Sequence, residues 1–213
     1  MPRPLVRVAI LVAVFATGAP LLAQSARPLN LGIGKLLVAR KNEPDPTFAT
    51  TVILLVRYEK DGTLGLVINR RTKVPIARAL EGLSAAKQRS EPVYLGGPVE
   101  RDTVFALLRA NTMPDGPSHV SGKIYLATAK AHLEKALAGS TASDLRVYLG
   151  YSGWDKEQLE NEVTAGVWDI VSDNADLAFD PEPDTLWSRL VAREDRQIAR
   201  LRPPRFAFTF PSR

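Results

Sequence analysis

The stretch VYLGYSGWDKEQLENEV, residues 147–163, joins two different residue patterns. Its first part is apolar and favours a strand, and its last part carries polar residues with Leu159 and Val163 spaced as on one face of a helix. Gly150 and Gly153 lie between the two parts, on either side of Ser152. The pattern predicts a strand over 146–149, a turn, and a helix over 154–167.

Ser152 has two possible roles in this turn. Gly150-Tyr151-Ser152-Gly153 resembles the start of a nucleophile elbow, but that motif is Gly-x-Ser-x-Gly and residue 154 is Trp. In elbow enzymes the catalytic histidine follows the serine, whereas both histidines of this chain precede it. We therefore expect Ser152 to be a helix N-cap that forms a capping box with Asp155. A cap that also borders a ligand or partner groove is the open alternative.

The other elements follow from apolar runs punctuated by glycine and proline. Asp61-Gly62 between two β-prone runs is a strong hairpin signal, because glycine tolerates the positive φ of a tight turn. Strands are expected at 33–39, 50–58, 64–69, 93–95, 104–109, 124–127, 146–149 and 168–171, and helices at 75–83, 130–138, 154–167 and 185–201. Because strands occur both as a hairpin and between helices, we expect a mixed sheet in an α+β or mixed α/β fold.

The N-terminal residues are typical of a secretory signal peptide. Met1–Arg7 is short and positive, Val8–Leu22 is almost wholly apolar, and Ala23-Gln24-Ser25 offers small residues for cleavage. The apolar run is shorter than the about 20 residues of a membrane-spanning helix and is interrupted by glycine and proline. We expect a signal peptide at 1–25, a single domain at 26–201 and a C-terminal tail at 202–213.

This leader predicts a periplasmic or secreted protein with no stable membrane span after cleavage. The alternative is an inner-membrane protein anchored by an uncleaved leader. Removing the two arginines of the leader lowers the net charge from +5 to +3, and the basic residues are spread along the chain. A nucleic-acid surface needs a concentrated positive field, so we do not expect nucleic acid as a partner.

Composition also limits the chemistry of any site. The chain has no cysteine, which excludes disulfides, thiolate zinc sites and cysteine nucleophiles. His119 and His132 have no second ligand at metal-binding spacing, and we interpret them as surface residues. Gly32-Ile33-Gly34-Lys35 lacks the Lys-Ser/Thr that opens the helix of a phosphate loop. No metal and no cofactor is expected.

Two further motifs have structural interpretations, each with an alternative. The acidic residues of 173–184 miss the EF-hand spacing and lie beside prolines, as turn residues do, so calcium binding is the weaker interpretation. Gly96-Gly97-Pro98 ends a strand, because glycine permits close backbone approach and proline cannot continue the ladder. The alternative is an anion-binding site formed by exposed backbone amides of that turn.

Several ordered motifs of the chain resemble the bacterial YqgE/AlgH family. They are Asp45-Pro46-Thr47-Phe48, 65–69, 92–99, 149–154 and 158–160, with further matches at Trp168, Phe179-Asp180 and Trp187. The resemblance spans residues 31–191. It implies an α+β fold whose mixed, largely antiparallel sheet curls into a pseudo-barrel with flanking helices. The family is functionally ill defined; a role in transcriptional regulation has been suggested for AlgH, and no catalytic residues are established.

The chain departs from the family pattern at four places. Family members generally lack the export signal, often have histidine where this chain has Leu108, and often have Asn-Arg/Lys-Pro where it has Asn69-Arg70-Arg71. They commonly have alanine at the position of Ser152, which argues against essential chemistry by its hydroxyl.

We therefore expect a non-enzymatic ligand- or protein-binding module of the cell envelope, with no catalytic residue. The expected partner is a protein or a small molecule that the sequence does not identify. The alternatives are a regulator-like role, as suggested for AlgH, and a carboxylate-dependent hydrolase using Glu160 or Glu162, which would need a second acid beside Glu162 in a deep pocket. Candidate groove residues are Asn69, Gly96, Gly97, Pro98, Tyr151, Ser152, Trp154, Gln158 and Glu162.

Overall fold

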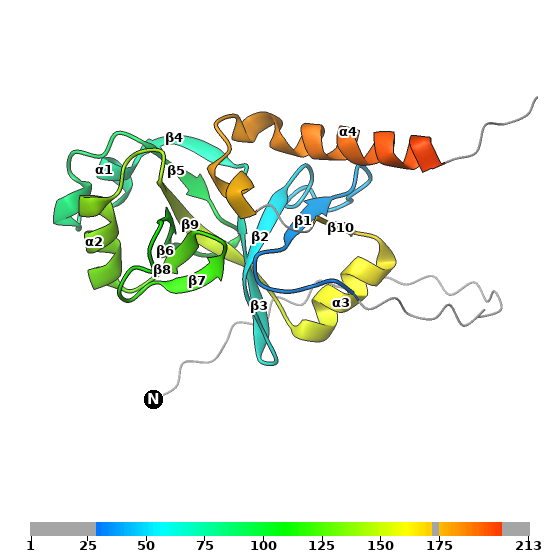
Figure 1. The fold of residues 1–213 in the computed structure, drawn as a ribbon, viewed down its shortest axis with the longest axis horizontal. Coiled ribbons are helices and arrows are strands. Elements are labelled where there is room, and N and C mark those ends of the chain that lie inside the picture. Colours follow the sequence, from blue (N-terminus) through cyan, green and yellow to red (C-terminus); the bar gives the residue numbers. More distant parts are fainter. Residues whose placement is uncertain (1–28, 172–174, 202–213) are drawn as a thin grey trace, which may run out of the picture.

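The computed structural model describes residues 29–171 and 175–201 (Figure 1). The expected signal peptide, the C-terminal tail and Asp173 of the acidic stretch lie outside the described residues. The strands are β1 (Leu36–Ala39), β2 (Val52–Glu59), β3 (Gly62–Val67), β4 (Arg71–Pro75), β5 (Pro92–Leu95), β6 (Val99–Arg109), β7 (Ser118–Ser121), β8 (Ile124–Ala127), β9 (Leu145–Trp154) and β10 (Trp168–Val171). The helices are α1 (Ile76–Ala79), α2 (Lys130–Gly139), α3 (Lys156–Ala165) and α4 (Pro183–Leu201), with short 3₁₀ helices η1 (Ser84–Ala86) and η2 (Ala175–Phe179).

The strands form one mixed, mostly antiparallel ten-stranded sheet. Its main path is β10-β1-β2-β3-β9-β6-β8-β7, and β5 pairs with β9 in parallel and with β4 antiparallel. A barrel requires its first and last strands to pair. Among the described strands, β10 and β7 are instead the two ends of the path. The α+β fold is confirmed, but the pseudo-barrel expectation was wrong, because the sheet is neither closed nor strongly curled.

Strand β9 connects the two halves of this sheet by changing partners along its length. Its first half lies between β5 and β6, and its last residues, Ser152–Trp154, pair with Thr63–Gly65 of β3. Gly150 separates the two parts with a φ of +71°, and a Cβ there would lie 2.8 Å from the carbonyl oxygens of Gly97 and Val99. Only glycine fits this crossing without strain.

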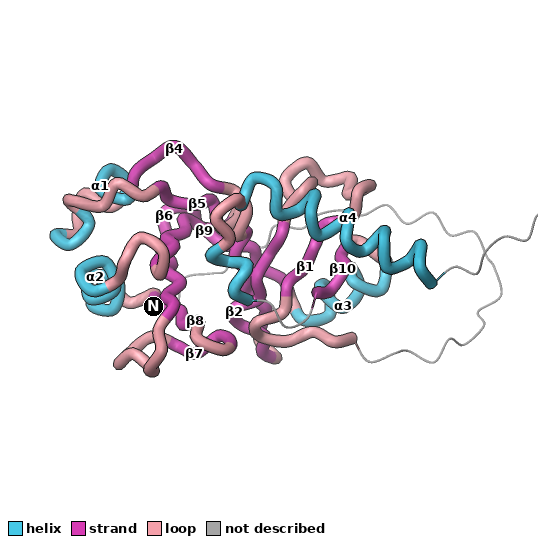
Figure 2. The backbone as a smooth tube through the Cα atoms, turned by 45° about the horizontal axis from the view of Figure 1, so that its top comes forward, coloured by secondary structure: helices cyan, strands magenta, loops and turns pink. Residues whose placement is uncertain are grey.

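Helices cover the two halves differently. In Figures 1 and 2, α1 and α2 lie beside the half that contains β4 to β8, and α3 and α4 lie on opposite faces of β1 and β10. Alternate residues of β1 therefore enter different clusters: Leu36 with Leu186 of α4, and Leu37 with Leu159 of α3. All four residues of β1 are buried, as expected for a strand covered on both faces.

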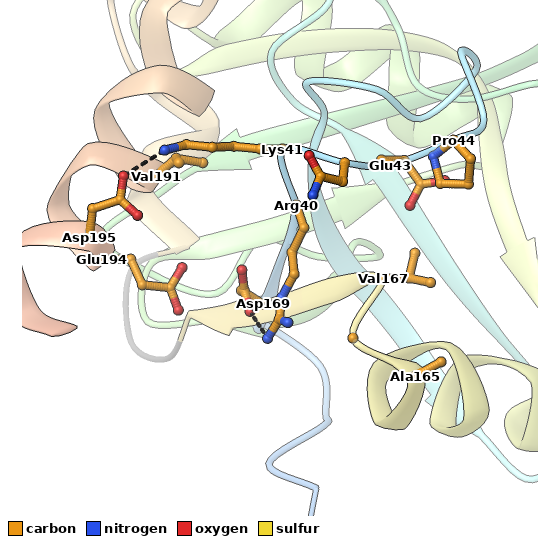
Figure 3. Close-up of a pocket in the computed structure, with 12 residues that line it drawn as sticks. Arg40, Lys41, Glu43, Pro44, Ala165, Val167, Asp169, Val191, Glu194 and Asp195 are labelled. Carbon is orange, nitrogen blue, oxygen red and sulfur yellow. Dashed lines mark hydrogen bonds and ion pairs between the residues drawn. The ribbon is translucent and has the colours of Figure 1, made fainter. Parts of the chain in front are cut away.

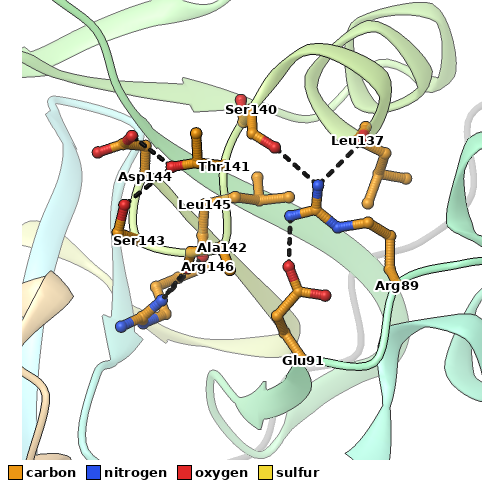
Figure 4. A network of polar contacts seen from close by, with 10 residues as sticks. All are labelled: Arg89, Glu91, Leu137, Ser140, Thr141, Ala142, Ser143, Asp144, Leu145 and Arg146. Carbon is orange, nitrogen blue, oxygen red and sulfur yellow. Dashed lines mark hydrogen bonds and ion pairs between the residues drawn. The ribbon is translucent and has the colours of Figure 1, made fainter.

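The C-terminal end of α2 is fixed by Arg89 (Figure 4). One guanidinium nitrogen donates to the carbonyl oxygens of Leu137 and Ser140, at 3.2 and 2.7 Å, and the other lies 2.7 Å from Glu91. The last carbonyls of a helix lack intrahelical donors and carry partial negative charge. Arg89 therefore satisfies them and attaches α2 to the segment before β5.

The hairpin at Asp61-Gly62 is confirmed, since β2 and β3 pair down to Glu59 and Gly62. Strands β4 and β7 were missed. The expected helix start at Trp154 was wrong, because Trp154 ends β9 and α3 begins at Lys156.

The prediction that Ser152 caps this helix was also wrong. Pairing with β3 keeps residues 152–154 extended, so Asp155 occupies the N-cap position instead. No helix of the described residues has both the length and the apolar character needed to cross a bilayer.

Candidate functional site

The glycines of the expected groove are packed against neighbouring backbone. Gly96 donates its N–H to the carbonyl of Leu149 and accepts from the amide of Val67, both at 2.8 Å. A Cβ on Gly97 would lie 2.1 Å from the carbonyl carbon of Tyr151. The structural interpretation of this turn is therefore supported, and the Gly96 amide is already used within the fold.

Ser152 and Asn69 also face inward, toward protein groups. Ser152 is 0% exposed, and its hydroxyl has no hydrogen-bond partner among the described residues. The Asn69 side chain accepts from the amide of Val52 at 2.8 Å and donates to the carbonyl of Thr50 at 2.9 Å, which fixes the start of β2. The structure thus places Ser152 and Asn69 in supporting positions, whereas Pro98 is exposed and Tyr151 is half-buried.

Glu162 joins α3 to the strands beneath it. Its Oε2 accepts from the indole N–H groups of Trp154 and Trp168 at 2.9 and 2.8 Å, and its Oε1 accepts from Gln158 at 2.9 Å. Phe48 stacks on Trp154 at 6.2 Å between ring centroids and meets Trp168 edge-on at 5.7 Å. The hydrogen-bond partners of Glu162 are neutral N–H groups, and the second acid that a hydrolase would need is not among them.

An open cleft of about 560 Å³ is lined by none of the expected groove residues (Figure 3). It runs between the loop after β1 (residues 40–44), the turn from α3 into β10 (residues 165–167) with Asp169 of β10, and the outer part of α4 (residues 191, 194 and 195). The three segments are far apart in sequence. They meet because β10 pairs with β1, and α4 crosses the face of the sheet on which Asp169 lies.

The cations of the cleft wall are already paired with carboxylates. Arg40 donates to Asp169 Oδ1 from Nε at 2.7 Å and lies 2.6 Å from it through a second nitrogen. Lys41 donates to Asp195 at 2.7 Å. Glu43 and Glu194 also line the cleft, so carboxylates outnumber cations there.

Burial and like charge act together on Glu194. Partial burial raises the pKa of the Glu194 carboxyl, and the nearby Asp169 raises it further through its charge and a hydrogen bond, while Arg40 opposes both effects. The hydrogen bond to Asp169 raises the pKa of Arg40. The cleft is therefore an acidic site in which an added cation would be stabilised.

A second, smaller cavity of about 200 Å³ lies between the end of β6 and α2, and Leu108 and His132 are in its wall. The imidazole of His132 packs against Gly116, where a Cβ would come within 2.1 Å of its Nε2. His119 lies in β7, the strand at one end of the sheet, and its Nε2 is 3.0 Å from the carbonyl oxygen of Gly122.

The acidic stretch after β10 is occupied by ion pairs. Asp176 pairs with Arg109, Asp180 with Arg189 and Asp184 with Arg71. Within residues 29–171 and 175–201, no group of three or more His, Asp or Glu side chains is placed to hold a metal ion.

The sequence did not indicate the cleft. The two local signals were the charged run after the apolar strand at 33–39 and the acidic pair Glu194-Asp195 in the last helix. Neither run shows that the other lies beside it, so the site could only be recognised from the tertiary structure.

Comparisons with known proteins agree with this fold. A family model described as AlgH-like matches residues 36–199. A UPF0301 protein of Streptomyces avermitilis is 33% identical over 172 residues, which cover 78% of this chain and 88% of that protein. The UPF0301 protein CT0663 of Chlorobaculum tepidum is 32% identical over 160 residues, covering 74% of this chain and 84% of that one.

Two solved structures are similar in fold. The solution structure of AlgH from Pseudomonas aeruginosa superposes with a TM-score of 0.63 at 27% identity, covering 80% of this chain and 94% of AlgH. The crystal structure of DIP2367 from Corynebacterium diphtheriae superposes with a TM-score of 0.66 at 20% identity, covering 81% and 94%. This chain therefore belongs to the AlgH-like family.

Proposed function

We propose that this chain is a non-enzymatic binding module of the cell envelope and that the cleft under α4 is its binding site. The observation that carries this proposal is the cleft itself. Its volume of about 560 Å³ lies within the range of ligand pockets, and charged groups from three separate segments converge on it.

A binding role fits the two side chains that could most readily have supported catalysis. A nucleophilic serine must reach its substrate, and Ser152 is 0% exposed within the sheet. A catalytic carboxylate must be free to exchange protons, and both oxygens of Glu162 accept hydrogen bonds from N–H groups. Ser152 and Glu162 therefore have structural roles within the fold: Ser152 is buried in the sheet, and Glu162 hydrogen-bonds two tryptophans and Gln158.

The expected groove at the centre of the sheet remains a second candidate surface. Pro98 and Gln158 are exposed there, and Tyr151 is half-buried against Phe105, with 5.8 Å between their ring centroids. A partner that contacts this surface would meet side chains, because the backbone of Gly96 and Gly97 is covered by β9.

Export is proposed from the pattern of residues 1–25 alone. Expressing the full chain with a C-terminal tag, fractionating the cells and determining the N-terminus of the recovered protein tests it. Recovery of a cleaved protein from the periplasm is expected. An intact chain in the inner-membrane fraction would favour the anchored alternative, and an intact cytoplasmic chain would contradict export.

The cleft is tested with a substitution that fills it. Ala165 is an exposed residue at the end of α3 in the cleft wall, and Ala138 is an exposed residue near the end of α2 outside it. A panel of chemically diverse small molecules and short peptides is screened by saturation-transfer NMR against the full chain and against Ala165→Trp and Ala138→Trp. Binders that are lost with Ala165→Trp but retained with Ala138→Trp support the site. The proposal fails if nothing binds, or if every binder is indifferent to Ala165→Trp.

A further inference from the structure

The outer edge of β10 is a second feature of the cleft. Among the described strands, β10 pairs only with β1. Arg40 donates its amide to Val167 at 3.2 Å, and antiparallel pairs alternate between residues that bond the partner strand and residues that do not. Asp169 and Val171 therefore bond β1, while the backbone N–H and C=O groups of Trp168 and Ile170 point to the outer edge.

Helices flank this edge on both faces of the sheet. Trp168 and Ile170 pack in the cluster that contains Leu159 of α3, and Asp169 faces α4 (Figure 3). Successive side chains of a strand point to opposite faces. A strand added at this edge would therefore direct every second side chain to the α4 face, on which Asp169 and Glu194 lie.

The charges on the α4 face favour basic side chains at those positions. Arg40 and Lys41 are each paired already, with Asp169 and Asp195, and Glu43 and Glu194 add two further carboxylates. Glu194 and Asp169 lie close enough to interact by hydrogen bond and by charge. A lysine or arginine between them would reduce the repulsion of the two carboxylates.

We propose that the outer edge of β10 and the cleft under α4 together take an extended, basic segment of a partner protein. The segment adds to the sheet as a further strand, so that its backbone bonds the outward groups of Trp168 and Ile170. Its lysine or arginine side chains contact Asp169 and Glu194. This inference rests on the proposed binding function and names the class of partner.

The test measures binding of fluorescein-labelled peptides to the full chain by fluorescence anisotropy. One peptide of about eight residues, an ordinary strand length, alternates lysine and valine, and its control alternates glutamate and valine. Free spermidine supplies the same cationic chemistry without a backbone. The lysine peptide is expected to bind more weakly as salt is added, the glutamate peptide not to bind, and spermidine to compete poorly.

Matched variants separate the two parts of the site. Ile170→Pro removes an outward N–H without removing a bond to β1, and we expect it to weaken peptide binding by about two- to tenfold. Ile170→Val keeps that N–H and should bind like the wild type. Glu194→Gln should weaken binding about two- to fivefold, as for an ion pair in a cleft open to solvent, whereas Glu157→Gln on α3, outside the cleft, should not.

Amide hydrogen exchange of the wild type keeps the test independent of whether Ile170→Pro folds. Strand addition predicts slower exchange of the Trp168 and Ile170 amides when the lysine peptide is bound. Unchanged exchange, or equal binding by Ile170→Pro and Ile170→Val, would overturn strand addition. Equal binding of the glutamate peptide would overturn the charge argument.

The experiment also separates this inference from the proposed function. If the lysine peptide fails to bind while other binders sensitive to Ala165→Trp exist, only the basic partner is wrong. If no binder is sensitive to Ala165→Trp, the binding function is wrong as well.

Discussion

At the scale of single residues, the most constrained positions are those where the fold leaves no room or no alternative partner. Gly97 and Gly150 let β9 touch the turn after β5, where a side chain would meet backbone atoms. Glu162 supplies the acceptors for two buried indoles. Packing and internal hydrogen bonds account for the residue types at these positions, without chemistry on a substrate.

Replacing Glu162 with glutamine should destabilise the protein by about 1–3 kcal/mol. The Glu162 carboxylate accepts from three N–H groups. A glutamine amide has one oxygen and one NH2 group, so its NH2 group would face an N–H donor and leave that donor without an acceptor. Urea unfolding followed by tryptophan fluorescence measures the change. Glu157→Gln, at an exposed position in the first turn of the same helix, is the control and should change stability by less than about 1 kcal/mol, the usual contribution of a carboxylate there. Equal effects of the two variants would show that the indole contacts add nothing.

Adding one methyl group at Gly97 should cost more than about 2 kcal/mol, since the atoms it would meet are backbone atoms of Tyr151 and Ser152 that cannot rotate away. Gly139→Ala is the matched control, because no atom lies within 4 Å of its Cβ position and alanine suits the last turn of α2. Thermal unfolding should separate the two variants clearly. A stable Gly97→Ala protein would mean that β9 can move away from the turn.

At the scale of elements, α4 determines the shape of the cleft. Trp187 donates its indole N–H to the carbonyl of Ala39 at 2.6 Å, and Leu186 is buried on the sheet. Further along the helix the contacts become ionic, through Lys41 with Asp195 and through Glu194 beside Asp169. The inner turns of α4 are therefore held by apolar packing, and its outer turns respond to charge.

The stability contributed by Glu194 should depend on pH. Its pKa in the folded protein is raised above the ordinary 4.5, so the folded state binds this proton more tightly than the unfolded state. The stabilisation is complete below 4.5 and is lost as the pH rises through the raised pKa. Glu194→Gln should therefore be more stable than the wild type at neutral pH, by less than about 1 kcal/mol because the cleft is open to solvent, which screens the charges.

Free energies of unfolding of both proteins, measured in urea on each side of pH 4.5, test this. The advantage of Glu194→Gln over the wild type in free energy of unfolding should grow as the pH rises from below 4.5 to neutrality. Parallel curves for Glu194→Gln and the wild type would contradict the interaction with Asp169.

At the scale of the whole molecule, β9 links two differently covered halves of the sheet. It lies between β5 and β6 at one end and beside β3 at the other. One cluster of buried residues also includes side chains from both halves, among them Leu54 and Tyr148. We therefore expect a defect in one half to be felt in the other.

Leu145→Ala tests this coupling. Leu145 is 1% exposed at the start of β9, and its truncation should cost about 2–5 kcal/mol. The three tryptophans all lie in the other half, with α3 and α4. Tryptophan fluorescence and far-UV circular dichroism should therefore shift together to lower urea, as in a two-state transition.

Leu95→Ala is the control, because Leu95 is 43% exposed and its truncation should have little effect. A fluorescence transition that does not move in Leu145→Ala would show that the halves unfold separately.

Local sequence patterns by themselves determined the β2–β3 hairpin, the α+β class and the family. Each of these depends on neighbours in the chain: turn residues set backbone angles, and apolar periodicity reports which face is buried. The tertiary structure alone decided that residues 152–154 stay extended, that the sheet stays open, and that Arg40, Asp169 and Glu194 share one cleft. The reason is physical: strand pairing and charge interactions depend on distance in space, and no local pattern states which distant segment will arrive beside another.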